Sequence, residues 1–145
     1  MNSLGKRFTF TSFGESHGLA IGGVLDGVPA GVAIDFSMIR QALLERRGAH
    51  LTSKHGASTR ALQEPDEIEW LSGVLEGKTL GTPIAFIIRN KNAQSSDYDY
   101  LKQSYRPGHA DFTYQTKYGI RDWRGGGRAS ARETAARVVA GSIAL

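Results

Sequence analysis

The pattern of hydrophobic and polar positions predicts several strands in the first part of the chain. Residues 7–12 alternate in polarity and residues 19–25 are mostly apolar, so each segment is expected to form a strand. Residues 67–74 and 83–89 are also predicted strands, and the β-branched side chains of the second indicate a buried position. Strand formation is therefore expected on both sides of a long polar stretch.

Helices are predicted where a capping residue precedes an apolar face. Asp35 is a suitable N-cap for a helix that carries aliphatic residues every three to four positions. Asp111 is expected to cap a short helix, with Phe112 and Tyr118 on its apolar side and Gly119 at its end. Both helices begin from an aspartate that can accept hydrogen bonds from free backbone amides.

The last predicted helix begins at a capping box. Ser130 and Glu133 have the spacing of that motif, and an Ala/Val-rich segment follows. The segment reaches Leu145 without a stop signal, so we expect the chain to be truncated in mid-helix. One helical turn is expected near residues 97–101, and the polar stretch 48–65 is expected to be either a functional loop or mobile.

Length and composition narrow the function classes. The chain has 145 residues, which suits one domain, and a net charge of +4, which suits an acidic partner. It contains no cysteine, so neither disulfides nor thiolate metal sites are expected. It shows no secretory signal and no apolar run of membrane-spanning length, and we therefore expect a cytoplasmic protein with no membrane partner.

Residues 106–134, RPGHADFTYQTKYGIRDWRGGGRASARET, carry the strongest chemical signal. Arginine presents a planar fork of donors that matches phosphate and carboxylate oxygens, and glycines allow backbone amides to approach an anion. The stretch therefore predicts a site for a multiply anionic small molecule. Its basic residues are Arg106, Lys117, Arg121, Arg124, Arg128 and Arg132.

Two histidines are candidate proton donors. His17 lies in the turn Gly-Glu-Ser-His-Gly, where its imidazole is expected to be exposed and Ser16 ready to bond an anion. The alternative is a surface histidine in a hairpin turn. His109 lies among fixed positive charges, and its alternative is a structural role with Asp111 or a backbone carbonyl as partner.

The triple glycine 125–127 has two interpretations as well. It resembles an anion cradle, although the P-loop pattern is absent; the alternative is a turn that permits close packing. Arg132 lies in the first turn of the following helix and would be repelled by the helix dipole, which suggests an anion nearby. No close set of His and carboxylate ligands predicts a metal site.

These motifs together resemble those of the chorismate synthase family. GESHGLAIGGVLDGVPAG and RPGHADFTYQTKYGIRDWRGGGRASARETAARVVAG are similar to its first two signature regions, and residues 64–98 fit the same family. The family's chain is more than twice as long, so residues 1–145 correspond to its N-terminal portion. The implied fold is α+β, a β-α-β sandwich with helices between antiparallel sheets, of which this chain holds roughly the first half.

The resemblance implies a lyase of the shikimate pathway, and hence of aromatic amino acid biosynthesis. The family removes phosphate from 5-enolpyruvylshikimate 3-phosphate by anti-1,4-elimination, as a homotetramer that uses reduced FMN, with NADPH needed only indirectly to reduce the flavin. By motif match, His17 would protonate the departing phosphate and His109 would donate to the flavin. The implied substrate-binding residues are Ser16, Arg47, Arg106, Ser130, Arg132 and, more weakly, Lys54; the implied cofactor-binding residues are Arg128, Ala129, Ser130 and His109.

Two functions of other classes stay open beside the lyase. One is an inactive truncated fragment, or a subunit that needs the rest of the family's chain in trans. The other is a basic module that binds RNA through interleaved aromatic and arginine side chains, with steep salt dependence. The enzyme hypothesis predicts no nucleic-acid partner and competition for the site by phosphorylated shikimate derivatives.

Overall fold

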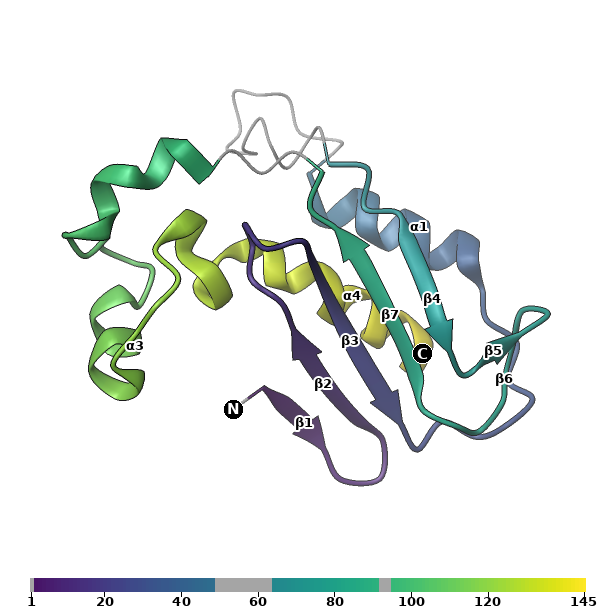
Figure 1. Ribbon diagram of the computed structural model, residues 1–145. Coiled ribbons are helices and arrows are strands. Elements are labelled where there is room, and N and C mark those ends of the chain that lie inside the picture. The colour runs from purple at the N-terminus through teal and green to yellow at the C-terminus, as the bar shows by residue number, and fades with distance from the viewer. Residues whose placement is uncertain (1, 49–63, 92–94) are drawn as a thin grey trace.

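An antiparallel sheet forms the centre of the computed structural model, which describes residues 2–48, 64–91 and 95–145 (Figure 1). Its strand order is β1-β2-β3-β7-β4. These strands span Ser3–Gly5 (β1), Thr9–Phe13 (β2), Ala20–Asp26 (β3), Ile68–Ser72 (β4) and Ile84–Arg89 (β7), and Val74–Leu75 (β5) pairs with Lys78–Thr79 (β6) in a separate hairpin. All four predicted strands are confirmed, although β4 ends at Ser72 and Val74 of the predicted strand 67–74 belongs to β5. The edge strand β1 and the β5–β6 hairpin are additional.

Two helices lie against one face of this sheet. Helices α1 (Phe36–Arg46) and α4 (Thr134–Ala144) pack on each other, and α4 also contacts β3 and β2. Helix α3 (Asp111–Tyr118) and the 3-10 segment η2 (Ser95–Lys102) lie beside the sheet in a separate lobe (Figure 1). The short 3-10 segments η3 (Arg124–Ala129) and η4 (Ala131–Glu133) join this lobe to α4. The arrangement is α+β, as expected.

The core lies between the sheet and the two helices. Ile84, Phe86 and Ile88 alternate along β7 and are fully buried, because every second side chain of a strand faces the same side. Helix α4 presents mainly alanines to this layer, which lets the helix approach the strands closely. The core therefore fixes the end of β7 and the start of α4, and the candidate site residues Ser130 and Arg132 lie just before α4.

The start of α1 confirms the predicted cap. The Asp35 carboxylate accepts hydrogen bonds from the backbone amides of Ser37 and Met38, each at 2.9 Å. The Ser37 hydroxyl also donates to Asp35, and these bonds together hold the pKa of Asp35 below its ordinary value. The capping chemistry seen in the sequence thus determines where this helix begins.

The start of α3 corrects the second predicted cap. Ala110, with a φ of 54°, is the capping residue, and Asp111 is the first residue of the helix. The buried Asp111 carboxylate instead accepts from the Arg106 backbone amide at 2.9 Å and from Arg121 at 3.3 Å. Two donors from outside the helix thus engage this carboxylate. Gly119 ends the helix in the left-handed region, as predicted.

The predicted apolar side of α3 is also corrected. Phe112 and Tyr118 are 63% and 56% exposed. The reason is the position of α3 in the outer lobe, where the sheet does not cover this side of the helix (Figure 1).

The capping box before α4 forms only in part. The Ser130 hydroxyl accepts a hydrogen bond from the Arg132 backbone amide at 3.3 Å. The Glu133 carboxylate, however, accepts from the Ser12 hydroxyl at 2.6 Å and from Arg137 at 2.7 Å. Glu133 is drawn away from the cap because β2 offers a buried donor to its carboxylate.

Two further predictions concern the polar segments. Segment η2 contains the predicted helical turn at residues 97–101. Residues 49–63, which include Lys54 and most of the predicted loop, lie outside the described residues. Within the described ranges, no helix has both the length and the apolar character to cross a bilayer.

Candidate functional site

Two segments that are far apart in the sequence meet at the centre of the candidate site. The turn at residues 14–18 follows β2, and residues 125–127 belong to η3. The Ser16 hydroxyl donates to the Gly125 carbonyl at 3.1 Å, and the Ser16 backbone amide donates to the Gly127 carbonyl at 3.3 Å. The predicted anion ligand Ser16 is thus held against the triple glycine.

The triple glycine packs directly on both candidate proton donors. A Cβ on Gly125 would lie 2.2 Å from Cδ2 of His17, and a Cβ on Gly126 would lie 2.6 Å from Cδ2 of His109. These distances are shorter than any van der Waals contact, so only glycine fits at the two positions. The alternative interpretation, a turn that permits close packing, therefore describes this geometry; the anion cradle stays a prediction.

His17 is buried, which corrects both interpretations of its turn. Its exposed fraction is 6%, whereas an exposed donor and a surface histidine would each face solvent. The Tyr98 ring packs edge-on against the imidazole at 4.8 Å between centroids, and Gly125 lies against it. The prediction missed this burial because the covering groups come from η2 and η3.

His109 forms a polar contact with each ring nitrogen. Its Nε2 contacts a guanidinium nitrogen of Arg106, and its Nδ1 lies 3.3 Å from the Pro107 carbonyl. A guanidinium nitrogen only donates, so the Arg106 contact engages Nε2 as an acceptor. The ring of His109 is therefore held between the Arg106 side chain and a backbone carbonyl.

Arg106 connects the two histidines. Its guanidinium lies over the Tyr98 ring, 5.6 Å from the centroid, and Tyr98 in turn contacts His17. Within the described part of the chain, no carboxylate is paired with the Arg106 side chain. Its positive charge is therefore available for an anionic ligand.

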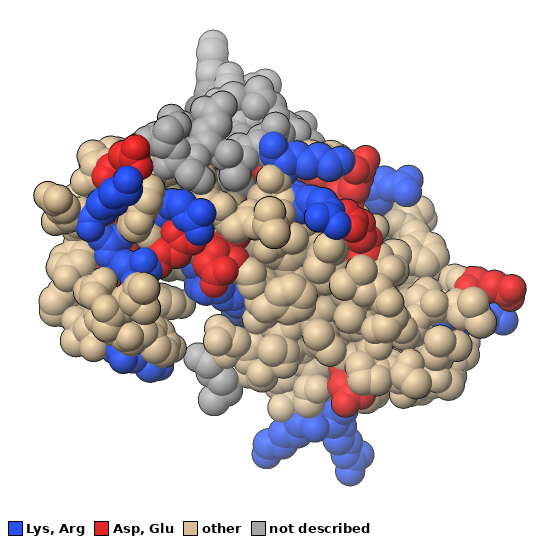
Figure 2. Space-filling model, viewed as in Figure 1, with Lys and Arg blue, Asp and Glu red and all other residues tan. Residues whose placement is uncertain are grey.

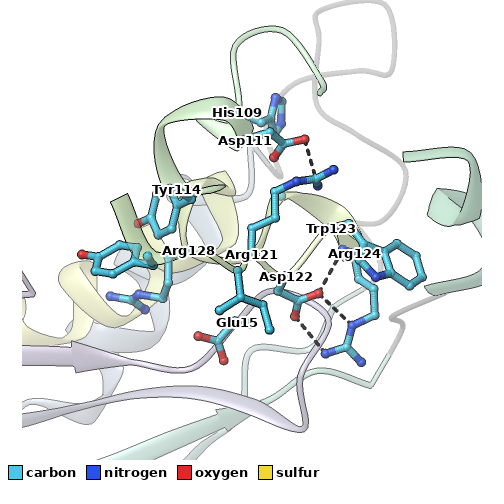
Figure 3. Close-up of a pocket in the computed structure, with 13 residues that line it drawn as sticks. Glu15, His109, Asp111, Tyr114, Arg121, Asp122, Trp123, Arg124 and Arg128 are labelled. Carbon is cyan, nitrogen blue, oxygen red and sulfur yellow. Dashed lines mark hydrogen bonds and ion pairs between the residues drawn. The ribbon is translucent and has the colours of Figure 1, made fainter. Parts of the chain in front are cut away.

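A cavity of about 750 Å³ opens beside this centre, between α3 and the 14–18 turn (Figure 3). This volume is within the range of small-molecule and cofactor sites. The predicted cofactor-binding residues His109 and Arg128 both lie on its wall. The full lining is Glu15, His109, Asp111, Tyr114, Tyr118, Ile120, Arg121, Asp122, Trp123, Arg124, Gly126, Gly127 and Arg128.

Two ion pairs stabilise the wall of this cavity. Arg121 contacts Asp111 at 3.3 Å, and Arg124 contacts Asp122 at 2.8 Å (Figure 3). Partial burial alone would raise the pKa of Asp122, but the hydrogen bonds and charge of Arg124 outweigh it and hold that pKa below its ordinary value. Asp122 is therefore ionised at neutral pH, and these two arginines are compensated within the protein.

The Arg128 side chain points to the end of β2. It donates to the Gly14 carbonyl at 2.9 Å and to the Ser12 hydroxyl, and it lies 3.3 Å from the Glu133 carboxylate. Burial would raise the pKa of Glu133, but hydrogen bonds from Arg137 and Ser12 and the charges of Arg137 and Arg128 lower it below its ordinary value. Arg128 thus ties η3 to the sheet.

A second group of site residues surrounds Arg132. Its Nε donates to the Asn90 side-chain oxygen at 2.9 Å, and it forms an ion pair with the buried Asp66. Asp66 also pairs with Arg46 of α1 at 2.9 Å. The anion expected near Arg132 is therefore supplied by the protein itself.

The remaining predicted residues lie next to these two groups. Arg47 is the C-cap of α1, and its side chain donates to the Glu64 carbonyl, two residues before Asp66 in the sequence. Ser130 caps η4, and the partly buried Ala129 precedes it. The structure thus assembles His17, Ser16, Arg106 and His109 around the triple glycine, and it places Arg132 with Asp66.

Sequence reasoning missed Asn90, Tyr98 and Asp66. Asn90 directly follows the buried strand β7, and a polar residue at that position was an available signal. Tyr98 lies in a polar segment with no distinguishing pattern, and Asp66 has a φ of 51° that the sequence does not reveal. Each of these three residues contacts site residues that lie far away in the sequence, so local patterns do not reveal its role.

Comparisons with known proteins agree on one family. The profile of the family described as chorismate synthase matches residues 8–145. The chorismate synthases of Christiangramia forsetii and Parabacteroides distasonis are 59% and 60% identical, over 99% of this chain and 39% of each relative. A crystal structure of chorismate synthase superposes with a TM-score of 0.65 at 36% identity, over 95% of this chain and 32% of that one. The chain thus spans about two fifths of the length of these curated relatives.

Proposed function

The chain belongs to the chorismate synthase family, and from this premise we propose that residues 1–145 form the N-terminal portion of a phosphate lyase. The proposed reaction is the anti-1,4-elimination of phosphate from 5-enolpyruvylshikimate 3-phosphate, which gives chorismate. The observation that carries the proposal is the packing of His17 and His109 on adjacent glycines, beside Arg106. This arrangement offers two proton donors and a fixed positive charge within one site.

The substrate's anionic groups fit the charges of the site. The substrate carries a phosphate and two carboxylates, and Arg106 retains an uncompensated guanidinium among the described residues. Arg132 is already paired with Asp66. Because that carboxylate partly neutralises the guanidinium, Arg132 would attract an anionic substrate less strongly than Arg106. We therefore propose Arg106 as the main anion ligand of this chain, with Ser16, Arg47, Ser130, Arg132 and Lys54 as further ligands.

The proposed acid is His17. A phosphate dianion is a poor leaving group, and a positioned acid together with fixed positive charge lowers the barrier to its departure. The burial of His17 by Tyr98 and Gly125 excludes water from one side of the imidazole. His17 would donate its proton to the leaving phosphate as the carbon–oxygen bond breaks.

The cavity beside His109 fits reduced FMN in size and in lining. Its wall combines tyrosine and tryptophan rings with the backbone of Gly126 and Gly127, which suits a planar ring system. His109, Arg128, Ala129 and Ser130 would hold the cofactor. When bound, reduced FMN would lend an electron transiently to the substrate, and NADPH would serve only to reduce the flavin.

Turnover under anaerobic conditions with reduced FMN tests this proposal. His17→Ala and His109→Ala in the complete enzyme should each nearly abolish chorismate formation, because each removes a proposed proton donor. Arg40→Lys, at an exposed position on α1, is the matched control and should retain full activity. Full activity of either histidine variant would refute the role assigned to that residue.

The cellular setting follows from the same proposal. We place the enzyme in the cytoplasm, in the shikimate pathway of aromatic amino acid biosynthesis, and as a homotetramer. The small-molecule substrate is its proposed partner, and no nucleic-acid partner is proposed.

A further inference from the structure

Asn90 connects the turn that carries His17 to the start of helix α4. The side-chain amide donates to the Glu15 carbonyl at 3.0 Å and to the Gly18 carbonyl at 2.9 Å. Its oxygen accepts from Nε of Arg132 at 2.9 Å. Because an amide nitrogen donates and an amide oxygen accepts, these three partners fix the orientation of the side chain.

The two carbonyls that Asn90 engages lie on either side of His17 in the chain. The Gly18 backbone amide also donates to the Glu15 carbonyl at 3.0 Å, so Asn90 reinforces an existing tight turn. The Asn90 backbone amide donates to the Leu19 carbonyl at 3.1 Å, which anchors the same segment to the end of β7. The backbone around His17 is therefore tied to the end of β7, an interior strand of the sheet.

The opposite end of this connection is equally well fixed. Arg132 is 7% exposed, and its ion-pair partner Asp66 is 4% exposed and also binds Arg46 of α1. The chain of contacts thus runs from α1 through Asp66, Arg132 and Asn90 to the turn at residues 14–18. Hydrogen bonds to charged groups are among the stronger ones in a protein interior, so this chain resists displacement.

We propose that Asn90 is a positioning residue for His17. Through its hydrogen bonds, Asn90 holds the 14–18 turn in the position where the His17 imidazole packs on Gly125. The same side chain contacts Arg132, so the position of the turn depends on the orientation of Arg132. This inference rests on the proposed function, in which His17 protonates the departing phosphate and Arg132 contacts the substrate. Asn90 itself touches neither the substrate nor the cofactor in this assignment.

The substitution Asn90→Asp should keep the contact with Arg132 and remove the two hydrogen bonds to the 14–18 turn. The aspartate has nearly the same shape and still accepts from Arg132, but it places a carboxylate oxygen opposite two carbonyl oxygens. We expect kcat to fall about ten- to hundredfold, because small displacements of a catalytic group carry penalties of that order. The KM for the phosphorylated substrate should change much less, because the Arg132 contact is retained. Asn2→Asp introduces the same charge at an exposed position and should leave both constants unchanged.

The imidazole resonances of His17 supply a readout that does not depend on turnover. In the ligand-free protein labelled with ¹⁵N-histidine, Asn90→Asp should shift the His17 ring signals, and Asn2→Asp should not. Wild-type His17 signals together with wild-type kcat in Asn90→Asp would overturn the proposal, even if the variant melts at a lower temperature. If Asn90→Asp does not fold, Asn90→Ala is judged by the same spectra.

This design keeps the two proposals distinguishable. Failure of the complete wild-type enzyme to form chorismate would contradict the proposed function, and the His17 signals would still test whether Asn90 positions the turn. Normal turnover with unshifted His17 signals in the variants would contradict only the role of Asn90.

Discussion

Single residues at the triple glycine set the distance between the backbone and the two imidazoles. Gly125 lies against the buried His17, and Gly126 lies against the half-buried His109. Both glycines also have positive φ, so a side chain at either position would meet a steric obstacle and an unfavourable backbone conformation. The contact with the ring and the backbone conformation can be separated by experiment.

Gly126→Ala should displace His109, and Gly31→Ala is its matched control. The two glycines have φ values of 83° and 82°, but a Cβ on Gly31 would meet nothing within 4 Å. We expect each substitution to lower the free energy of unfolding by about 1–3 kcal/mol because of its backbone conformation. Only Gly126→Ala should shift the His109 ring signals and lower turnover. Equal effects of the two variants on His109 would contradict the packing argument.

At the level of elements, a buried carboxylate joins strand β2 to helix α4. Glu133 lies just before α4 and accepts from Ser12 of β2 at 2.6 Å and from Arg137 of α4 at 2.7 Å. Arg128 of η3 completes this cluster at 3.3 Å. The cluster therefore fixes the end of β2, from which the 14–18 turn extends to His17.

The stability supplied by Glu133 should depend on pH with a defined sign. Its pKa in the folded protein is lower than its ordinary value of 4.5, so the stabilisation is complete above that value. It is lost as the pH falls through the lower, folded pKa. We expect Glu133→Gln to reduce the free energy of unfolding by about 1–3 kcal/mol at pH 7. Urea titrations at pH 7, 5 and 3 should show that the difference from wild type shrinks towards pH 3.

Glu69→Gln is the control for this prediction. Glu69 also pairs with an arginine, Arg89, at 2.6 Å, and that hydrogen bond lowers the pKa of Glu69. Its side chain is 44% exposed, so solvent screens the pair and the substitution should have a smaller effect. A Glu133→Gln effect that stayed constant from pH 7 to pH 3 would show that the ionised carboxylate is not the stabilising form.

On the scale of the whole molecule, the arrangement of charge on the surface bears on the choice of partner. On the face seen in Figure 2, acidic and basic side chains lie next to one another over the upper half. The RNA-binding alternative predicts a basic patch or stripe, and this face does not supply one. The net charge of +4 suits acidic partners in general. On the cavity wall, Arg121 and Arg124 are already paired with carboxylates, whereas the nearby Arg106 has no such partner among the described residues.

The proposed homotetramer can be tested by size-exclusion chromatography with light scattering. We expect a mass four times that of the purified polypeptide, because several large apolar side chains on the described surface are of the kind that assembly covers. Leu71 is 59% exposed and Leu75 is 61% exposed. A single-subunit mass at every concentration would contradict the assembly and leave the fold assignment unchanged.

Local patterns determined much of the secondary structure. The buried strand at 83–89 follows from its β-branched composition, and the start of α1 follows from the ability of Asp35 to accept two amide hydrogens. The same capping rule predicts Asp111 as the cap of α3. In the structure its carboxylate instead accepts hydrogen bonds from two donors outside the helix. Prediction succeeded where neighbours in the chain supply the partners and was wrong where distant segments supply them.

The sequence by itself determined the family, the four strands, the start of α1 and the identity of the charged and titratable residues. Only the tertiary structure decided the burial of His17, the pairing of Arg132 with Asp66 and the link through Asn90. The physical reason is that these contacts join residues tens of positions apart, as with the 109 positions between Ser16 and Gly125. Capping and periodicity act within a few residues, whereas packing and charge compensation depend on which segments the fold brings together.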